Sequence, residues 1–217
     1  MKRQPRSANV QESSIDTRIC KKDNIEVFTK LVSKKRGGRA RMVYDLKGEA
    51  NMPPIVGILY SAVKENSQRL QLITDGMSQE EVDYKGPNNN FNSTAQLIKH
   101  IMYVDLNWVY RIKELPLPQS LKEQYGPMID ENNRIPMIKG ISLNTLISKY
   151  EDVFMMLKDS CAQLTDADLD KVVTFGHENE KKATKRWGLW HMADHNRYHQ
   201  AQINQLRRWY SGENTIG

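Results

Sequence analysis

Three histidines lie close together near the end of the sequence, at His191, His195 and His199. Residues four apart on an α-helix differ in direction by about 40°, so these side chains form one slowly drifting stripe. His195 and His199 lie at the centre of the apolar face, close to Met192 and Ile203. Two imidazoles at this spacing can bind one metal ion. The pattern favours a metal-binding pair, and a stack of hydrogen-bonded core histidines is the alternative.

His100 is the candidate for a third ligand, because it lies beside Leu97 and Val104 on the apolar side of an earlier helical pattern. His177 lies in the polar stretch GHENEKK, and we interpret it as a surface residue. Three histidines leave at least one position of a divalent transition metal open, whereas a closed structural site uses four protein ligands. An open position can hold water with a lowered pKa, or bind and deprotonate a thiol. The histidines therefore predict a metal site that is open for chemistry.

Four further side chains are candidates for the surroundings of this site. His191 is one turn away from the predicted pair, and we interpret it as a packing or outer-sphere residue, with a fourth ligand as the alternative. Asp105 and Asp194 are near the histidines in sequence, and a carboxylate can orient an imidazole N–H group; solvated carboxylates are the alternative. Arg111 is a candidate partner for a substrate carboxylate, and an ordinary surface arginine is the alternative.

The elements that must position these residues are helices, because apolar residues recur at helical spacing in four segments. The predicted helices cover about 53–76, 93–114, 142–164 and 184–210. Ser93 or Thr94 is the expected N-cap of the second helix, and Gly212 follows the last one. No strand is expected. We interpret residues 77–92 as a loop, and no helix crosses the four prolines between residues 114 and 140.

The long connection between the second and third helices has a topological consequence. If it travels the length of a bundle, these two helices run parallel to each other. The prediction is therefore an all-α fold, a four-helix bundle in the order up-down-down-up with a long crossover between helices 2 and 3.

The positive charge of the chain is concentrated at its start. Residues 1–52 hold 13 Lys+Arg and 6 Asp+Glu, whereas the remaining residues hold 19 and 20. We expect residues 1–51 to be a basic, poorly ordered N-terminal extension and residues 52–212 to form the bundle. A phosphate-binding surface needs clustered Lys and Arg on a folded face. The predicted bundle shows no such cluster in its sequence, so nucleic-acid binding is not favoured.

Other features of the sequence restrict the cellular location of the protein and the kinds of active site that it can contain. Cys20 and Cys161 form no CxxC motif, which fits a reducing cytoplasm. Cys161 falls in an apolar helical pattern and is expected in the core. No run approaches the roughly 18 apolar residues of a membrane span, and the N-terminus does not resemble a secretory signal. The GxxxxGK[ST] loop and the GxSxG elbow are absent from the sequence.

Two segments resemble the DinB-like superfamily: NSTAQLIKHIMYVDLNW at 92–108 and LWHMADHNRYHQAQI at 189–203. The resemblance implies that His100, His195 and His199 hold a divalent transition metal such as zinc or nickel, and that a homodimer is common among relatives. Relatives usually have a histidine just before the last ligand and then Arg-Gly-Gln. Tyr198 stands at the first of these places, and Gln202 keeps the glutamine of the pattern.

The resemblance also implies a class of reaction. Members with known activity are metal-dependent transferases or isomerases that use low-molecular-weight thiols, including bacillithiol and mycothiol. We therefore expect an enzyme that conjugates a low-molecular-weight thiol to a small electrophilic substrate, with a related hydrolase as the close variant. A stress-associated or DNA-damage-associated metal-binding protein, whose basic tail contacts nucleic acid, is the alternative. A bundle with purely structural core histidines is the third possibility.

Overall fold

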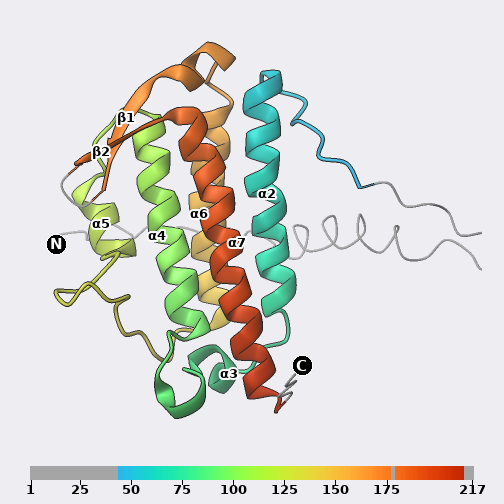
Figure 1. Cartoon of the computed structure of the whole chain (residues 1–217), viewed down its shortest axis with the longest axis vertical. Helices are drawn as coiled ribbons and strands as arrows, with labels where there is room; N and C mark the ends of the chain where they lie inside the picture. Colours follow the sequence, from blue (N-terminus) through green and yellow to red (C-terminus); the bar gives the residue numbers. More distant parts are fainter. Residues whose placement is uncertain (1–43, 177–178, 213–217) are drawn as a thin grey trace, which may run out of the picture. The chain divides into compact units, whose positions relative to one another are not determined.

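The computed structural model describes residues 44–176 and 179–212. Their long helices match the four predicted segments: α2 (Pro54–Thr74), α4 (Thr94–Ile112), α6 (Leu143–Cys161) and α7 (Lys185–Tyr210) (Figure 1). The shorter elements are α3 (Gln79–Asp83), α5 (Gln119–Tyr125), two 3₁₀ helices (Pro87–Asn89 and Asp166–Asp170) and the strands β1 (Val172–Phe175) and β2 (Lys181–Thr184). The basic run at 34–41 lies outside the described residues, so the predicted disorder of the extension remains a prediction.

Local capping explains where the long helices begin. The Ser93 hydroxyl accepts a hydrogen bond from the Gln96 backbone N–H, and the Gln96 side chain accepts one from the Ser93 backbone N–H. Ser142 and Thr184 cap α6 and α7 in the same way, each through its side-chain oxygen. Pro54 lies in the first turn of α2, where a missing N–H group has no intrahelical partner to lose. These caps confirm the predicted helix starts.

The four long helices pack together as a bundle, with α2 against α7 and α4 against both α6 and α7. Figure 1 shows α2 and α7 running in one direction and α4 and α6 in the other. Two hydrogen bonds agree with this: Asn66 donates to the carbonyl of Ala193, and Arg207, further along α7, donates to the carbonyl of Ile73, further along α2. The segment between α4 and α6 returns the chain to the other end of the bundle.

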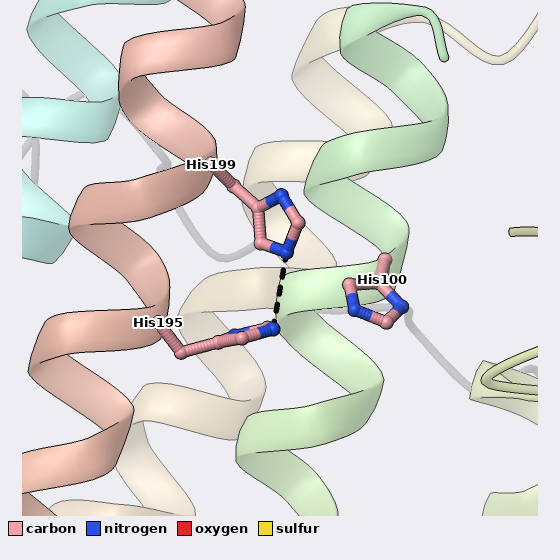
Figure 2. Close-up of side chains that lie close together, drawn as sticks. All are labelled: His100, His195 and His199. Atoms are coloured by element: carbon pink, nitrogen blue, oxygen red, sulfur yellow. Dashed lines mark hydrogen bonds between the residues drawn. The ribbon is translucent and has the colours of Figure 1, made fainter.

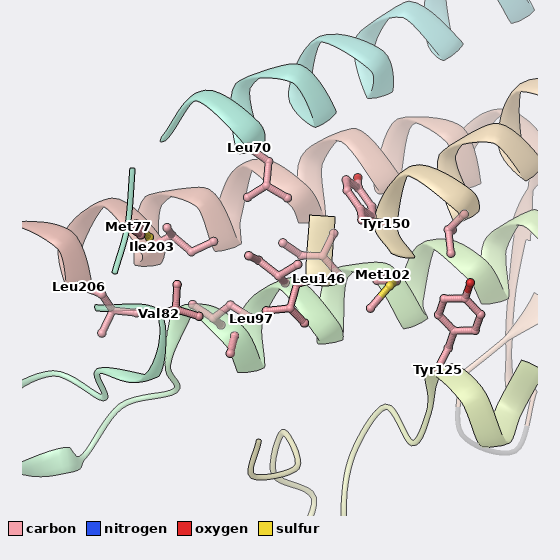
Figure 3. Close-up of a cluster of buried hydrophobic side chains, with 14 of the residues drawn as sticks. Leu70, Met77, Val82, Leu97, Met102, Tyr125, Leu146, Tyr150, Ile203 and Leu206 are labelled. Atoms are coloured by element: carbon pink, nitrogen blue, oxygen red, sulfur yellow. The ribbon is translucent and has the colours of Figure 1, made fainter. Parts of the chain in front are cut away.

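The interior contains two clusters of buried apolar side chains. One of them, around Leu97, Leu146 and Ile203, joins α4, α6 and α7 (Figure 3). In the other, Trp108 of α4 is 2 % exposed and lies against α7 at Gly188. A Cβ atom at position 188 would lie 2.5 Å from the Trp108 ring, so the glycine permits this close approach of the two helices.

The prediction that the chain has no strand is wrong in one place. β1 pairs antiparallel with β2, with Val173 opposite Ala183. The first strand carries the β-branched and aromatic residues that favour extended structure. The second strand is polar and lies in a stretch that the sequence pattern indicated to be a loop. The fold is thus mostly helical with a small hairpin, rather than all-α.

Two predicted connections also contain short helices. Ser78 caps α3 within the segment 77–92, where its hydroxyl accepts from the Glu81 backbone N–H. α5 fits between Pro118 and Pro127 without crossing either proline. None of the helices in the described residues is long and apolar enough to span a membrane.

The last residues of the predicted extension contact the bundle. The Glu49 carboxylate forms an ion pair with Lys64 of α2 at 2.9 Å. The Glu49 backbone N–H also donates to the carbonyl of Gly57, at 3.5 Å. The segment just before α2 is therefore held against that helix.

Candidate metal centre

The structure brings together the three histidines predicted as ligands. His100 extends from α4, and His195 and His199 extend from α7 one turn apart, with their rings pointing toward one another (Figure 2). One ring nitrogen from each lies within 4.8 Å of those of the other two. The centroid of the His100 ring is 5.2 Å from that of His195 and 5.0 Å from that of His199. Helical phase within α7 and the packing of α4 on α7 together create this cluster.

Hydrogen bonds define the tautomer of His199. Its Nδ1 lies 2.7 Å from Oε1 of Gln202, and a carbonyl oxygen can only accept, so Nδ1 carries the proton. The lone pair of His199 is therefore on Nε2, which lies 3.0 Å from Nε2 of His195 (Figure 2). Without a cation, Nε2 of His195 must therefore carry a proton and donate it to this lone pair. A metal ion would instead accept a lone pair from each.

The donor set fits a divalent transition metal. Zinc–imidazole bonds of about 2.1 Å place the nitrogens of a tetrahedral site about 3.4 Å apart. The two Nε2 atoms of His195 and His199 lie 3.0 Å apart, and all three ligand nitrogens lie within 4.8 Å of one another. No carboxylate or thiol of the described residues belongs to the cluster, so the protein supplies three nitrogen ligands. Nδ1 of His195 is buried and has no hydrogen-bond partner among the described residues.

Burial keeps these imidazoles neutral. Burial, together with charge repulsion from the neighbouring His199, His100 and His191, lowers the pKa of His195 to about 3. Burial likewise lowers the pKa of His199 to about 4 and shifts the pKa of His100 downward. Because a metal binds only the unprotonated imidazole, the cluster is ready to bind a cation at neutral pH without first releasing protons.

These shifts predict that acid destabilises the metal-free protein. Below pH 6.5 the unfolded chain binds protons at His195 and His199, whereas the folded chain does not until the pH approaches 4. The free energy of unfolding should therefore decrease as the pH is lowered from about 6.5 to about 4. The decrease is up to about 1.4 kcal/mol per pH unit for each histidine. Urea unfolding at several pH values, compared with a His195→Gln/His199→Gln variant, isolates this contribution. Identical slopes for the two proteins would contradict it.

The long connection between α4 and α6 covers one side of the cluster. Nδ1 of His100 lies 3.3 Å from the carbonyl oxygen of Met128, so this ring is oriented by the connection. The amide of Gln96 donates to the carbonyls of Ile135 and Pro136, which fixes the same segment one turn earlier on α4. The crossover is thus a wall of the site as well as a link in the chain.

Gln202 was selected from the family pattern, and the structure gives it a specific contact. It is the hydrogen-bond partner that holds the His199 ring, and partners of this kind typically contribute 10–100-fold to metal affinity. We expect Gln202→Leu to weaken zinc binding by roughly 10–100-fold. Gln205→Leu is the matched control, because Gln205 lies one turn along the same helix without a hydrogen bond to a histidine. Equal zinc affinities of the two variants in a chelator competition would refute this role.

His191 lies beside the cluster without joining it. Its ring stacks on Trp187 with centroids 4.6 Å apart and planes 10° apart, and it meets Trp108 edge-on. The packing interpretation fits this arrangement. The Arg111 guanidinium lies over the Trp108 ring at 5.3 Å. A role for Arg111 in binding a substrate carboxylate remains a prediction.

Asp105 belongs to a buried network that the sequence analysis did not find. Its Oδ2 accepts a hydrogen bond from the Tyr150 hydroxyl at 3.0 Å, and Asn196 donates to the same hydroxyl at 2.6 Å. Gln200 in turn donates to the Asn196 side chain. Burial raises the pKa of Asp105 to about 8, so this carboxyl group is largely protonated at neutral pH. Its partner in the described structure is a tyrosine, whereas the sequence left an imidazole or solvent as the two alternatives.

Three other candidates lie away from the centre of the cluster. Asp194 is exposed on α7. Tyr198 is 64 % exposed, and its ring centroid is 5.2 Å from that of His199. Cys161 is fully buried, and burial raises the pKa of its thiol to about 12, as expected for a core residue and not for a nucleophile.

Comparison with known proteins agrees with the site. The pattern of the DinB superfamily matches residues 62–203, which include all three histidines of the cluster. A Bacillus subtilis (strain 168) protein, the uncharacterized protein YkkA, is 46 % identical over 165 residues, corresponding to 76 % of this chain and 93 % of that protein.

Proposed function

Because this chain belongs to the DinB superfamily, we propose that it is a metal-dependent enzyme that joins a low-molecular-weight thiol to an electrophile at the His100, His195 and His199 cluster. The observation that carries the proposal is a cluster of three partly or fully buried, neutral imidazoles with no fourth protein ligand among the described residues. Zinc or nickel is the expected metal. An up-down-down-up bundle supplies α4 and α7 as the two rigid supports of the cluster.

The reaction requires an ionised sulfur at neutral pH. A free thiol has a pKa of about 8.5 and is mostly protonated there. A divalent metal held by three imidazoles supplies a Lewis acid that lowers the pKa of a thiol or water in its open position. Sulfur then forms a bond to carbon, the bond from carbon to the leaving group breaks, and the thiol proton passes to solvent with the leaving group. Hydrolysis is the close variant, in which water replaces the thiol.

Other residues of the chain orient the histidine rings and form the surface beside them. His199 is oriented by Gln202 and His100 by the carbonyl of Met128, so two of the three rings have their directions set before a ligand arrives. Trp187 and His191 form an aromatic surface beside His195. Such a surface excludes water from one side of the cluster and offers a platform for an apolar or aromatic electrophile.

A conjugation assay tests this proposal. Protein loaded with zinc or nickel should accelerate the reaction of bacillithiol, mycothiol or cysteine with 1-chloro-2,4-dinitrobenzene at pH 7. His195→Ala should reduce the rate to the uncatalysed background. Arg197→Gln is the control, because Arg197 is exposed on the same helix. Equal rates for wild type and His195→Ala would reject a catalytic role for the cluster.

Two alternatives make different predictions. A stress-associated protein that contacts nucleic acid through its basic tail would bind DNA with a strong salt dependence, and removal of residues 1–50 would abolish that binding. A bundle with purely structural histidines would bind no metal. The expected homodimer also remains a prediction, and Trp190, exposed on α7, is a candidate residue for the contact.

A further inference from the structure

An open cavity of about 660 Å³ lies along α7. Gln202 and Gln96 line it, and Gln202 is the residue that holds His199. The loop at 85–92 and the crossover at 130–137 form its other walls. A cavity of this volume is within the range that accommodates small-molecule ligands. Its contact with Gln202 places such a ligand beside the cluster.

Two cationic side chains in the walls of the cavity have no partner among the described residues. Lys85 and Arg134 both line it, and neither forms an ion pair or side-chain hydrogen bond with another of the described residues. One carboxylate, Asp130, also lines the cavity, but one of its oxygens accepts from the backbone N–H groups of Asn132 and Arg134. The walls thus carry one positive charge in excess, and an arginine fork suits a carboxylate by bidentate hydrogen bonding.

The remaining polar groups of the cavity are mainly amides. Asn89, Asn90 and Asn92 come from the loop between α3 and α4. That loop is held against α7, since the Phe91 ring lies 4.6 Å from that of Trp209. Amides both donate and accept hydrogen bonds, so they suit the amide or hydroxyl groups of an elongated polar molecule. The two aromatic rings offer an apolar surface between them.

We propose that this cavity binds a small polar molecule through its carboxylate, which pairs with Arg134 and Lys85, while the amide wall contacts the rest of the ligand. This inference rests on the proposed function for one point only, that the bound molecule reacts at the histidines. The ligand lies along α7, with its reacting end near His199 and its carboxylate at the far end. A peptide-like thiol with a terminal carboxylate has the required groups.

The test uses S-methylglutathione, which keeps the carboxylates of a peptide-like thiol but has no free sulfhydryl group. Calorimetric titration should show binding to the wild-type protein and binding at least roughly tenfold weaker to an Arg134→Gln/Lys85→Gln variant, because charge-assisted hydrogen bonds are lost. The diethyl ester of the same peptide should bind both proteins equally weakly. Lys122→Gln/Lys139→Gln is the control, since it removes the same charge from two exposed positions outside the cavity.

The outcomes separate this inference from the proposed function. Equal binding of S-methylglutathione to wild type and to the Arg134→Gln/Lys85→Gln variant, or no binding to either, would overturn the carboxylate site. Wild-type affinity for the acid no greater than for the diester would do the same. Loss of binding in the cavity variant, in protein that fails to catalyse conjugation, would keep the carboxylate site and reject the thiol reaction.

Discussion

Replacing His195 or His199 with alanine is expected to abolish tight binding of a divalent metal. Each substitution removes one of three nitrogen donors and leaves two, too few for a stable zinc site. Loss of an outer-sphere partner costs about 10–100-fold in affinity, so loss of a direct ligand should cost more than about 100-fold. Competition with a chromogenic chelator at pH 7 measures this directly.

The control for this experiment is on the same helix. Tyr198→Ala truncates a side chain that is 64 % exposed and should leave the affinity within about twofold of wild type. Circular dichroism of each variant separates loss of ligands from loss of fold. A folded His199→Ala protein with wild-type zinc affinity would show that His199 does not bind the metal.

Tyr150→Phe is expected to destabilise the protein by about 2–4 kcal/mol, although it removes only one oxygen atom. The hydroxyl is the centre of the buried network: it donates to Asp105 and accepts from Asn196. Its removal leaves a buried carboxyl oxygen and a buried amide N–H group without their partner, and each such group typically costs about 1–3 kcal/mol. Urea unfolding at pH 7 measures the loss.

Tyr125→Phe is the matched control for this substitution. Tyr125 is buried in the same apolar cluster as Tyr150, but its hydroxyl forms no hydrogen bond with another described residue. We expect it to change the free energy of unfolding by less than about 1 kcal/mol. Similar losses for the two variants would mean that the network contributes little. Asn196 is adjacent to His195, so loss of the network should also weaken zinc binding in Tyr150→Phe.

The helices and the histidine cluster were predictable because their causes are local or periodic. Ser93, Ser142 and Thr184 precede apolar helical patterns, and each caps the helix that follows. A spacing of four along α7 placed His195 and His199 on one face. The choice of His100 needed only that its apolar face pack on α7. None of these steps required knowledge of the register between helices.

The buried network could not be predicted, because it depends on that register. From the sequence, Asp105 was either a carboxylate that orients an imidazole or a solvated one, and neither interpretation pairs it with Tyr150. Which residue of α6 meets which residue of α4 is decided by packing along the whole length of both helices. The pairing of Tyr150 with Asp105 and Asn196 is therefore visible only in three dimensions. The hairpin was missed for a similar reason, since polar β2 is recognisable only by its pairing with β1.

The structure shows where the residues that differ from the family pattern around His199 lie. Tyr198, where the family resemblance implies a histidine, is exposed on α7. Gln200 is buried and donates to Asn196 and to the carbonyl of Asn66, so it joins α7 to α2. Gln202, which keeps the family residue, is the one that contacts a ligand histidine. The departures therefore leave the histidine cluster intact.

The central claim is that the three histidines bind a metal ion, and metal analysis of the wild-type protein tests it most directly. The protein would be purified without a histidine tag and without chelators, and its metals measured by mass spectrometry. We predict about one equivalent of zinc or nickel per chain, and near-complete loss in His199→Ala. A metal content near zero in wild-type protein that also fails to bind added zinc or nickel would contradict the claim.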